Sequence, residues 1–433
     1  APENAIGAVR LSKFAKYLIR QGHTVTVISP ELDADTRLDP SLDCAEFAAL
    51  KRHVVPQSGW FRRFVGARRK QVLATTTGAS LLADRPGGGM RGRLKALVFR
   101  NVQFGYTLLR NHDWKRQVLR YVRAHLRHER FDVVLSSYPS LGAMWAARQL
   151  RRSGVAPRWV ADFRDRVNYS TNSTPLLYRL NTGIQARLVR AADQVVAVSE
   201  GMGARITRGP SDKREVISNG FDPDDLRTIG SPRPADPDRR VLTLAYAGSL
   251  YGGERDMTVV FQALRRLVDE GVARPGEVEL VYAGKDFGVL RRQAAQAGME
   301  DILVDRGYVD RVESLRMQRD ADLVVVVTWN TPDDVGVLSG KLYECFLMRK
   351  PVVGVVNGTQ AHSEFRAVVE RVNGGIVYES ATPSPEADFE RLCAFLRDRL
   401  RERLEDGALA EGYRDVVEEY SYDHLAGRLH QLF

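Results

Sequence analysis

The sequence predicts an α/β protein with two parallel-sheet domains that face each other across a cleft. With 433 residues the chain is too long for one typical core, and two domains of about 200 residues are expected. Short runs of Val, Ile and Leu alternate with helical patterns in both halves, which is typical of parallel sheets covered on both faces. A stretch rich in Pro, Gly and charge separates the two series. We therefore place the domains at 1–225 and 241–412, with a linker at 226–240.

The first series begins with a helix at Leu11–Arg20, where apolar residues recur at helical spacing before Gly22. The four residues at the start of the chain have the pattern of a loop, so a first strand is expected upstream of Ala1. The strands of this series are expected at 23–29, 131–137, 158–163, 194–199 and 215–218, and its clearest later helices at 142–153 and 175–192.

The second series has the same alternation. Its strands are expected at 241–248, 279–284, 303–304, 323–327 and 352–356. In open parallel sheets of this kind, ligands bind beyond the carboxyl ends of the strands. The pattern therefore predicts two Rossmann-like domains with a binding site in the cleft between them.

The cysteines and the hydropathy limit the kind of protein. Cys44, Cys345 and Cys393 lie far apart, with neither a disulfide framework nor a metal-ligand spacing, which fits a reducing cytoplasm. No apolar run approaches the ~20 residues that a membrane-spanning helix needs, and no signal-peptide pattern is present. We expect a soluble or peripheral cytoplasmic protein without a structural metal.

Positive charge is concentrated in residues 51–128. This block holds 18 Lys or Arg residues against two acidic residues, although the surplus over the whole chain is only ten. Two segments within it, 60–65 and 94–100, interleave aromatic and aliphatic residues with cations. Such segments suit an anionic membrane surface on the inner face of the plasma membrane, and nucleic acid would also be attracted. A solvated surface on long helices explains the block equally well.

One short motif combines features of a nucleotide site. Ser339 is a plausible N-cap, and Gly340 and Lys341 would begin a helix that ends before Pro351. The free N–H groups and the dipole of a first helical turn favour an anion such as a phosphate. Lys341 would add a positive charge there, and Glu344, about one turn further on, suits a pair of sugar hydroxyls. An ordinary amphipathic helix with a solvated Lys and Glu is the alternative.

With both series and this motif together, the chain resembles retaining glycosyltransferases of family four, which have the GT-B fold. The resemblance covers nearly the whole chain and is strongest from Asp193 to Val356. It implies that the second domain binds a nucleotide-sugar donor and the first an acceptor. It also implies that the last segment, 413–433, is a helix that crosses back to the first domain.

The resemblance implies a set of donor-binding residues, carried over motif by motif. The segment 247–250 matches the loop after the first strand of the donor domain, where family members usually continue with an Arg and a Lys for the diphosphate, and Arg255 is the expected substitute. Segment 5–8 fills the place of an N-terminal glycine loop that faces the phosphates, and 283–285 and 306–309 match loops around the base. The implied residues are Gly7, Gly248, Ser249, Arg255, Gly284, Lys285, Tyr308, Gly336, Ser339, Gly340, Lys341 and Glu344.

The chain departs from the family at one position of this motif. Family members carry two glutamates eight positions apart, and Glu344 matches the second, whereas Gly336 stands at the first. The donor-sugar contact of that carboxylate is therefore absent, or it comes from a neighbour such as Asp333 or Asp334. The motif consequently does not name the sugar.

The acceptor side is expected at two strand ends of the first domain. Asp162, Arg164 and Asp165 stand where many family members have a His-Asp pair near the reacting sugar carbon, so they are the candidate catalytic residues. A structural salt-bridge network is the alternative. The adjacent strand end supplies the acceptor-side candidates Ser136, Ser137 and Tyr138.

These observations predict transfer of a sugar from a nucleotide-sugar, with a UDP-sugar as the expected donor, to a glycan or lipid-linked glycan, with retention of the anomeric configuration. Neither a cofactor nor a metal is expected, because Lys341 and Arg255 would neutralise the phosphates. A nucleotide-sugar epimerase or hydrolase is the alternative on the same architecture. A basic nucleic-acid-binding protein would leave the second domain unexplained, so no nucleic acid is expected.

Overall fold

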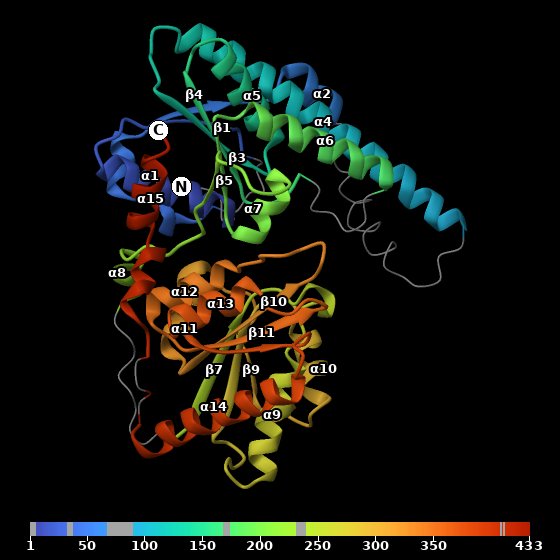
Figure 1. Cartoon of the computed structure of the whole chain (residues 1–433), viewed down its shortest axis with the longest axis vertical. Coiled ribbons are helices and arrows are strands. Elements are labelled where there is room, and N and C mark those ends of the chain that lie inside the picture. Colours follow the sequence, from blue (N-terminus) through green and yellow to red (C-terminus); the bar gives the residue numbers. More distant parts are fainter. Residues whose placement is uncertain are drawn as a thin grey trace.

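The computed structural model describes residues 6–32, 38–66, 90–167, 174–230, 240–407, 409 and 412–433. These residues form two α/β domains, one above the other along the longest axis of the molecule (Figure 1). Most of the predicted linker, at 231–239, and the middle of the basic block, at 67–89, lie outside the described residues.

The N-terminal domain contains two parallel sheets. One pairs β1 (Thr26–Pro30) with β2 (Lys51–Val55), and the other has the order β3-β4-β5-β6. The strands of the second sheet are β3 (Val133–Tyr138), β4 (Arg158–Phe163), β5 (Gln194–Ala197) and β6 (Arg214–Val216). The helices of the N-terminal domain are α1 (Ile6–Arg20), α2 (Gly59–Gly66), α4 (Met90–His125), α5 (Leu141–Arg152), α6 (Pro175–Ala191) and α7 (Glu200–Thr207).

The C-terminal domain has one six-stranded parallel sheet with the order β12-β11-β10-β7-β8-β9. Its strands are β7 (Leu242–Ala247), β8 (Val278–Ala283), β9 (Leu303–Asp305), β10 (Leu323–Asn330), β11 (Val352–Gly358) and β12 (Gly375–Glu379). Its helices are α9 (Thr258–Asp269), α10 (Phe287–Ala295), α11 (Arg311–Asp320), α12 (Gly340–Met348), α13 (Glu364–Arg371) and α14 (Pro385–Glu405). The strand order reverses between β7 and β10, so their carboxyl ends mark the expected ligand site.

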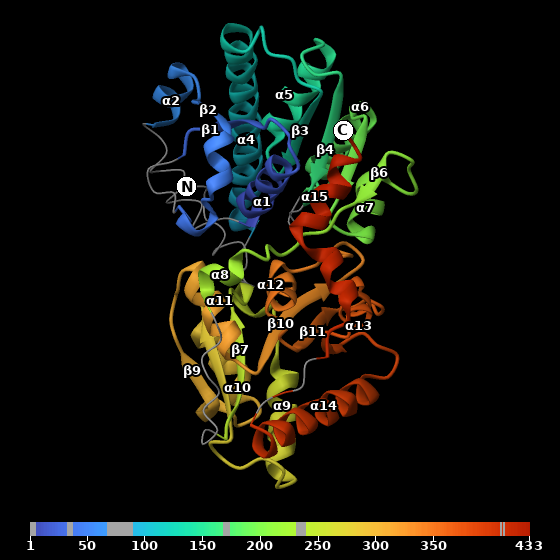
Figure 2. The same cartoon turned by 90° about the vertical axis from the view of Figure 1, so that its left-hand side faces the viewer.

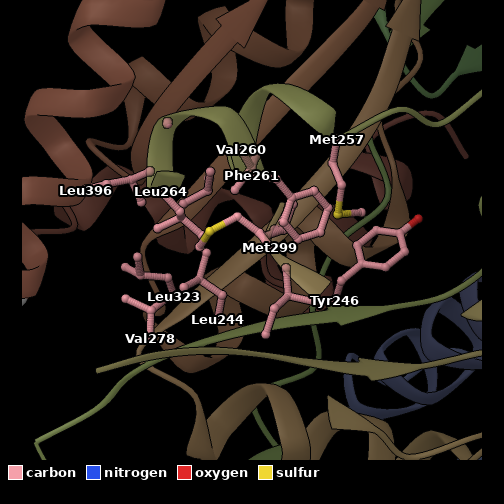
Figure 3. Packing of buried hydrophobic residues seen from close by; sticks show 14 of the residues in the cluster. Leu244, Tyr246, Met257, Val260, Phe261, Leu264, Val278, Met299, Leu323 and Leu396 are labelled. Carbon is pink, nitrogen blue, oxygen red and sulfur yellow. The ribbon is translucent and has the colours of Figure 1, made fainter. Parts of the chain in front are cut away.

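Alternation along the strands explains how this sheet is covered on both faces. In β10, Val325 and Val327 join the core that packs under α9 and α14, whereas Val324 and Val326 join the core under α12 and α13. Successive side chains of a strand point to opposite faces, so a continuous run of valines fills both cores. Figure 3 shows Phe261 among the side chains of the first core.

The chain crosses between the domains twice, and the two crossings are hydrogen-bonded together. The Phe221 N–H donates to the Tyr420 carbonyl at 3.0 Å, and the Tyr422 N–H donates to the Phe221 carbonyl at 2.8 Å. The last helix, α15 (Tyr422–His430), then lies beside α1 (Figure 2). The rings of Phe14 and Tyr422 meet edge to face at 5.4 Å between these two helices. The C-terminal segment therefore returns to the N-terminal domain.

Several boundaries differ from the predicted ones. The helix predicted at 11–20 begins at Ile6, so Gly7 lies in a first helical turn and not in a loop. Helix α8 (Asp225–Ile229) occupies the start of the predicted linker. The helix predicted for the whole of 413–433 is divided into a short 3₁₀ helix at Asp415–Tyr420 and α15, because Ser421 caps the second of them.

Candidate functional site

A cavity of about 460 Å³ lies between the two domains, at the carboxyl ends of β7 and β8 and the start of α12. Residues of the N-terminal domain and of both chain crossings close its other side. Eight of the twelve predicted donor-binding residues line it, namely Gly248, Ser249, Gly284, Lys285, Tyr308, Gly340, Lys341 and Glu344. The motifs that are scattered along the sequence therefore meet at one place.

The start of α12 presents a cation to the cavity. Ser339 caps the helix, and its hydroxyl oxygen accepts the Lys341 N–H at 3.3 Å. Gly248, at φ 134°, lies so close to the lysine stem that a Cβ there would be 2.8 Å from Lys341 Cε. No described residue forms a hydrogen bond or ion pair with the Lys341 ammonium, which leaves it available to an anionic ligand.

The Glu344 carboxylate is held in place by a hydrogen bond from a buried glutamine. Its Oε2 accepts a hydrogen bond from Gln318 Nε2 at 3.0 Å, and the same amide nitrogen donates to the Ser314 carbonyl at 3.1 Å. Gln318 is fully buried on α11, so this contact fixes the carboxylate while it faces the cavity. A fixed carboxylate of this kind suits a pair of vicinal hydroxyls.

The loops after β7 and β8 are packed against each other at the far end of the cavity. Tyr282 Oη donates to the Gly248 carbonyl at 3.1 Å, and a Cβ at Gly284 would lie 2.2 Å from that hydroxyl. The Ser249 hydroxyl donates to Asp286 at 2.6 Å. Lys285 Nζ lies 5.0 Å from the centre of the Tyr308 ring, and Tyr308 is 52% exposed, so the ring can stack against a planar ligand.

Four predicted donor-binding residues do not line the cavity. The Arg255 guanidinium lies over the rings of Tyr251 and Trp329, at 4.7 and 5.5 Å, and donates to the Ser249 carbonyl. This cation therefore braces the loop and does not face the cavity. Gly7 and Ser339 belong to helix starts, and Gly336 packs against α7 of the N-terminal domain.

Asp162, predicted as catalytic, belongs to a buried ion pair. Its carboxylate accepts Arg10 Nη2 at 3.0 Å and the Ser137 hydroxyl at 2.7 Å, and Arg10 also donates to the carbonyls of Ile217 and Ser218. Asp162 is 2% exposed and Arg10 is 0% exposed, so a substrate cannot reach this carboxylate. In the structure Asp162 thus lies in a buried salt-bridge network, as in the alternative interpretation.

Ser136, predicted on the acceptor side, is also a structural residue. Its hydroxyl accepts the Trp159 indole N–H at 2.9 Å and donates its own hydrogen to Met144 Sδ at 3.1 Å. All three residues are buried in the core of the N-terminal domain. Ser137 is the neighbouring candidate, and its hydroxyl donates a hydrogen bond to the buried Asp162 carboxylate.

The remaining candidates are half-buried, namely Tyr138 at the end of β3 and Arg164 and Asp165 just after β4. Arg164 Nε donates to the Tyr138 carbonyl at 3.1 Å, and burial lowers the pKa of its guanidinium. Burial also raises the pKa of Asp165, with a contribution from Asp334, and raises the pKa of Tyr138 to about 12. No described residue donates a hydrogen bond to Asp165, so it is the predicted catalytic carboxylate that stays available.

The cavity also contains charged residues that the sequence did not single out. Lys13 Nζ lies 2.6 Å from Asp222 and 2.7 Å from Asp225, and Arg311 Nη2 lies 2.6 Å from the other oxygen of Asp225. Arg311 Nη1 also donates to Ser41, so it joins the two domains. These residues come from α1, the first chain crossing and α11, and only the fold brings them together. In the sequence, the spacing of Arg10, Lys13 and Lys16 at every third residue is the feature that could have indicated a cationic face on this helix.

The described part of the chain contains no group of three His, Cys, Asp or Glu side chains arranged to hold a metal ion. Of the helices with described residues, none is long and apolar enough to cross a membrane.

Comparisons with known proteins identify the fold. Residues 70–225 match the family Glycosyltransferase Family 4, and no curated protein matches the chain. Sucrose-phosphate synthase from Thermosynechococcus elongatus is 13% identical, with a TM-score of 0.57 over 98% of this chain and 92% of that chain. The N-terminal domain of Candida albicans trehalose-6-phosphate phosphatase is 11% identical, with a TM-score of 0.54 over 99% and 92%. The predicted GT-B fold and the predicted relationship to family-four glycosyltransferases are confirmed.

Proposed function

We propose that this GT-B glycosyltransferase moves a sugar from a nucleotide-sugar, with a UDP-sugar as the expected donor, to a glycan or lipid-linked glycan, with retention of configuration. The observation that carries this proposal is the pair Lys341 and Glu344. Both line the cavity from the first turns of α12, one with an unengaged ammonium and the other with a fixed carboxylate. A nucleotide offers the matching groups, because its diphosphate and its ribose diol lie next to each other.

The chemistry of the site follows from charge. As the bond to the sugar breaks, negative charge grows on the leaving diphosphate, and Lys341 and the N–H groups that begin α12 would offset it. Arg255 lies outside the cavity, Lys13 and Arg311 are paired with Asp225, and Lys285 lies against the Tyr308 ring. Lys341 is therefore the main neutralising side chain, and we propose that neither a metal nor a cofactor is required.

The acceptor would approach from the N-terminal domain. Asp165 is half-buried and accepts no hydrogen bond from a described residue, and burial raises its pKa. A carboxylate of this kind suits the hydroxyl group that attacks the sugar. Asp165 therefore replaces Asp162 as the proposed acceptor-side acid.

A panel of nucleotide-sugars, incubated with and without glycan and lipid-linked acceptors, tests this proposal. Product analysis by mass spectrometry is expected to show transfer with one donor only when an acceptor is present. A changed sugar without any acceptor would indicate an epimerase, and free sugar would indicate a hydrolase. Turnover that survives a metal chelator would support the metal-independent mechanism.

We also propose that the N-terminal domain binds an anionic membrane on the inner face of the plasma membrane. Helices α2 and α4 expose Trp60, Val102 and Leu109, at 66, 63 and 61%. Arg62, Arg110 and other exposed cations lie on the same two helices. Apolar side chains that enter the interface beside cations that meet anionic head groups are the pattern of a peripheral protein.

Neutralising part of this surface is expected to weaken membrane binding at least tenfold, because each cation near an anionic surface contributes about 1 kcal/mol. The variant replaces Arg62, Arg63, Arg110 and Arg116 with glutamine, and flotation with phosphatidylglycerol vesicles measures the bound fraction. The matched control replaces four exposed arginines of the C-terminal domain, Arg274, Arg291, Arg292 and Arg316. Equal flotation of both variants would contradict a membrane role for α2 and α4.

A further inference from the structure

A carboxylate of the C-terminal domain contacts the first turn of a helix in the N-terminal domain. Glu364 begins α13, and one of its oxygens accepts the backbone N–H of Glu200 at 2.9 Å. Its other oxygen accepts the N–H of Gly201, so both contacts lie at the start of α7. A carboxylate is favoured there because the free N–H groups and the helix dipole are positive. This contact exists only while the two domains are together.

Two glycines make this approach of the domains sterically allowed. A Cβ at Gly201 would lie 2.7 Å from Glu364 Oε1. A Cβ at Gly336 would lie 2.4 Å from the Ser199 hydroxyl oxygen and 3.0 Å from the Met202 backbone nitrogen. A Cβ at either position would therefore force neighbouring atoms to shift, and at Gly201 it would displace the Glu364 carboxylate. Gly336, at φ 71°, also has a backbone conformation that favours glycine.

Two further contacts lie beside the glycines. Arg166 Nη2 and Asp334 Oδ1 are 3.0 Å apart, and their side chains are only 14 and 13% exposed. The Arg205 guanidinium donates to the Pro332 carbonyl. Pro332, Asp334 and Gly336 all belong to the segment 331–339, which leads directly into the Ser339 cap and Lys341. The phosphate end of the cavity and this contact between the domains are therefore joined by one short segment.

We infer that Glu364 is a positioning residue that holds the two domains in the closed arrangement, and that segment 331–339 couples closure to the binding of a nucleoside diphosphate at α12. This inference rests on the proposed function, because it assigns the phosphates to the start of α12. The chain crossings lie at one side of the interface and α7 at the other (Figure 1). A contact away from the crossings can hold the cleft closed while the crossings act as the hinge.

The inference predicts that Glu364→Gln lowers kcat about 10- to 100-fold, because a charged acceptor of two hydrogen bonds is lost. Affinity for the nucleoside diphosphate is expected to fall by much less than kcat, because Glu364 does not line the cavity and only the part of the binding free energy that is coupled to closure is lost. The ligand is whichever of UDP, GDP and ADP the wild type binds best in calorimetry. X-ray scattering is expected to show that this ligand compacts the wild type and no longer compacts the variant.

A second substitution and a matched control separate positioning from general damage. Gly201→Ala acts from the other domain and is expected to lower kcat in the same way, with effects that do not add to those of Glu364→Gln, because both remove one contact. Glu370→Gln, at an exposed site on the same helix α13, is expected to change nothing.

Three results would overturn the inference: unchanged kcat and compaction in both variants, a loss of ligand affinity as large as the loss of kcat, or unfolding of both variants as seen by circular dichroism. Failure of the wild type to transfer any sugar would instead refute the proposed function. The scattering and calorimetry still test closure in that case.

Discussion

Replacing Lys341 with alanine is expected to lower kcat/KM for sugar transfer about 100- to 1,000-fold, which is the usual effect of removing a group that stabilises charge in a transition state. The lysine lines the cavity, and no described residue forms a hydrogen bond or ion pair with its ammonium, so its charge is available to the leaving diphosphate. Initial rates with the donor identified in the nucleotide-sugar panel measure the effect. Calorimetry with the matching nucleoside diphosphate is expected to show weaker binding as well, because the product carries the same charge.

A lysine outside the cavity serves as the control. Lys51 is half-exposed on β2, where it pairs with Glu129 at 3.2 Å, so Lys51→Ala removes the same side chain from a position without a ligand. Lys51→Ala is expected to retain wild-type rates. A Lys341→Ala variant that transfers sugar within about threefold of the wild type would refute the phosphate role.

The parallel sheets could be predicted because their signal is local. Strand β4 was expected at 158–163 and has those bounds, since an apolar run that is buried on both faces needs no knowledge of its neighbours. Strand β2 was missed, because its first residues are Lys51, Arg52 and His53 and only Val55 is fully buried. Its place is set by pairing with β1, a contact that the sequence does not display.

The same distinction explains what could be predicted of the site. Lys341 and Glu344 lie on one helix, so their common face follows from helical geometry. Asp162 looked catalytic because it ends a strand, and only the fold shows Arg10, 152 residues away, beside it. In the sequence, Gly336 is notable only because it stands where the family has a glutamate that contacts the donor sugar. Its actual constraint is the close approach of α7, which a sequence without its fold cannot reveal.

Replacing Asp222 with asparagine is expected to lower the free energy of unfolding by about 3 to 5 kcal/mol, because it removes the carboxylate that two buried ammonium groups share and leaves Lys13 and Lys16 with one carboxylate partner each, Asp225 and Asp224. The Asp222 side chain is fully buried, and it lies 2.6 Å from Lys13 Nζ and 2.7 Å from Lys16 Nζ. Tyr17 Oη donates to it at 2.6 Å. This cluster fixes α1 to the first chain crossing, beside the donor cavity. Denaturant unfolding measures the effect at neutral pH.

The pH dependence of this difference identifies the charge as its cause. Burial would raise the pKa of Asp222, but the Lys13 charge and the hydrogen bonds from Lys13, Lys16 and Tyr17 outweigh it and hold the pKa well below its ordinary value. A depressed pKa stabilises the fold above the unfolded-state pKa of about 3.9, and this stabilisation fades as the pH falls below it. The wild type should therefore lose its greater free energy of unfolding relative to Asp222→Asn in acid.

Asp224→Asn is the matched control, because Asp224 also pairs with Lys16 but its side chain is 26% exposed. This substitution is expected to lower the free energy of unfolding by at most about 1 kcal/mol. A gap between wild type and Asp222→Asn that is the same at every pH would show that shape, and not charge, makes Asp222 necessary.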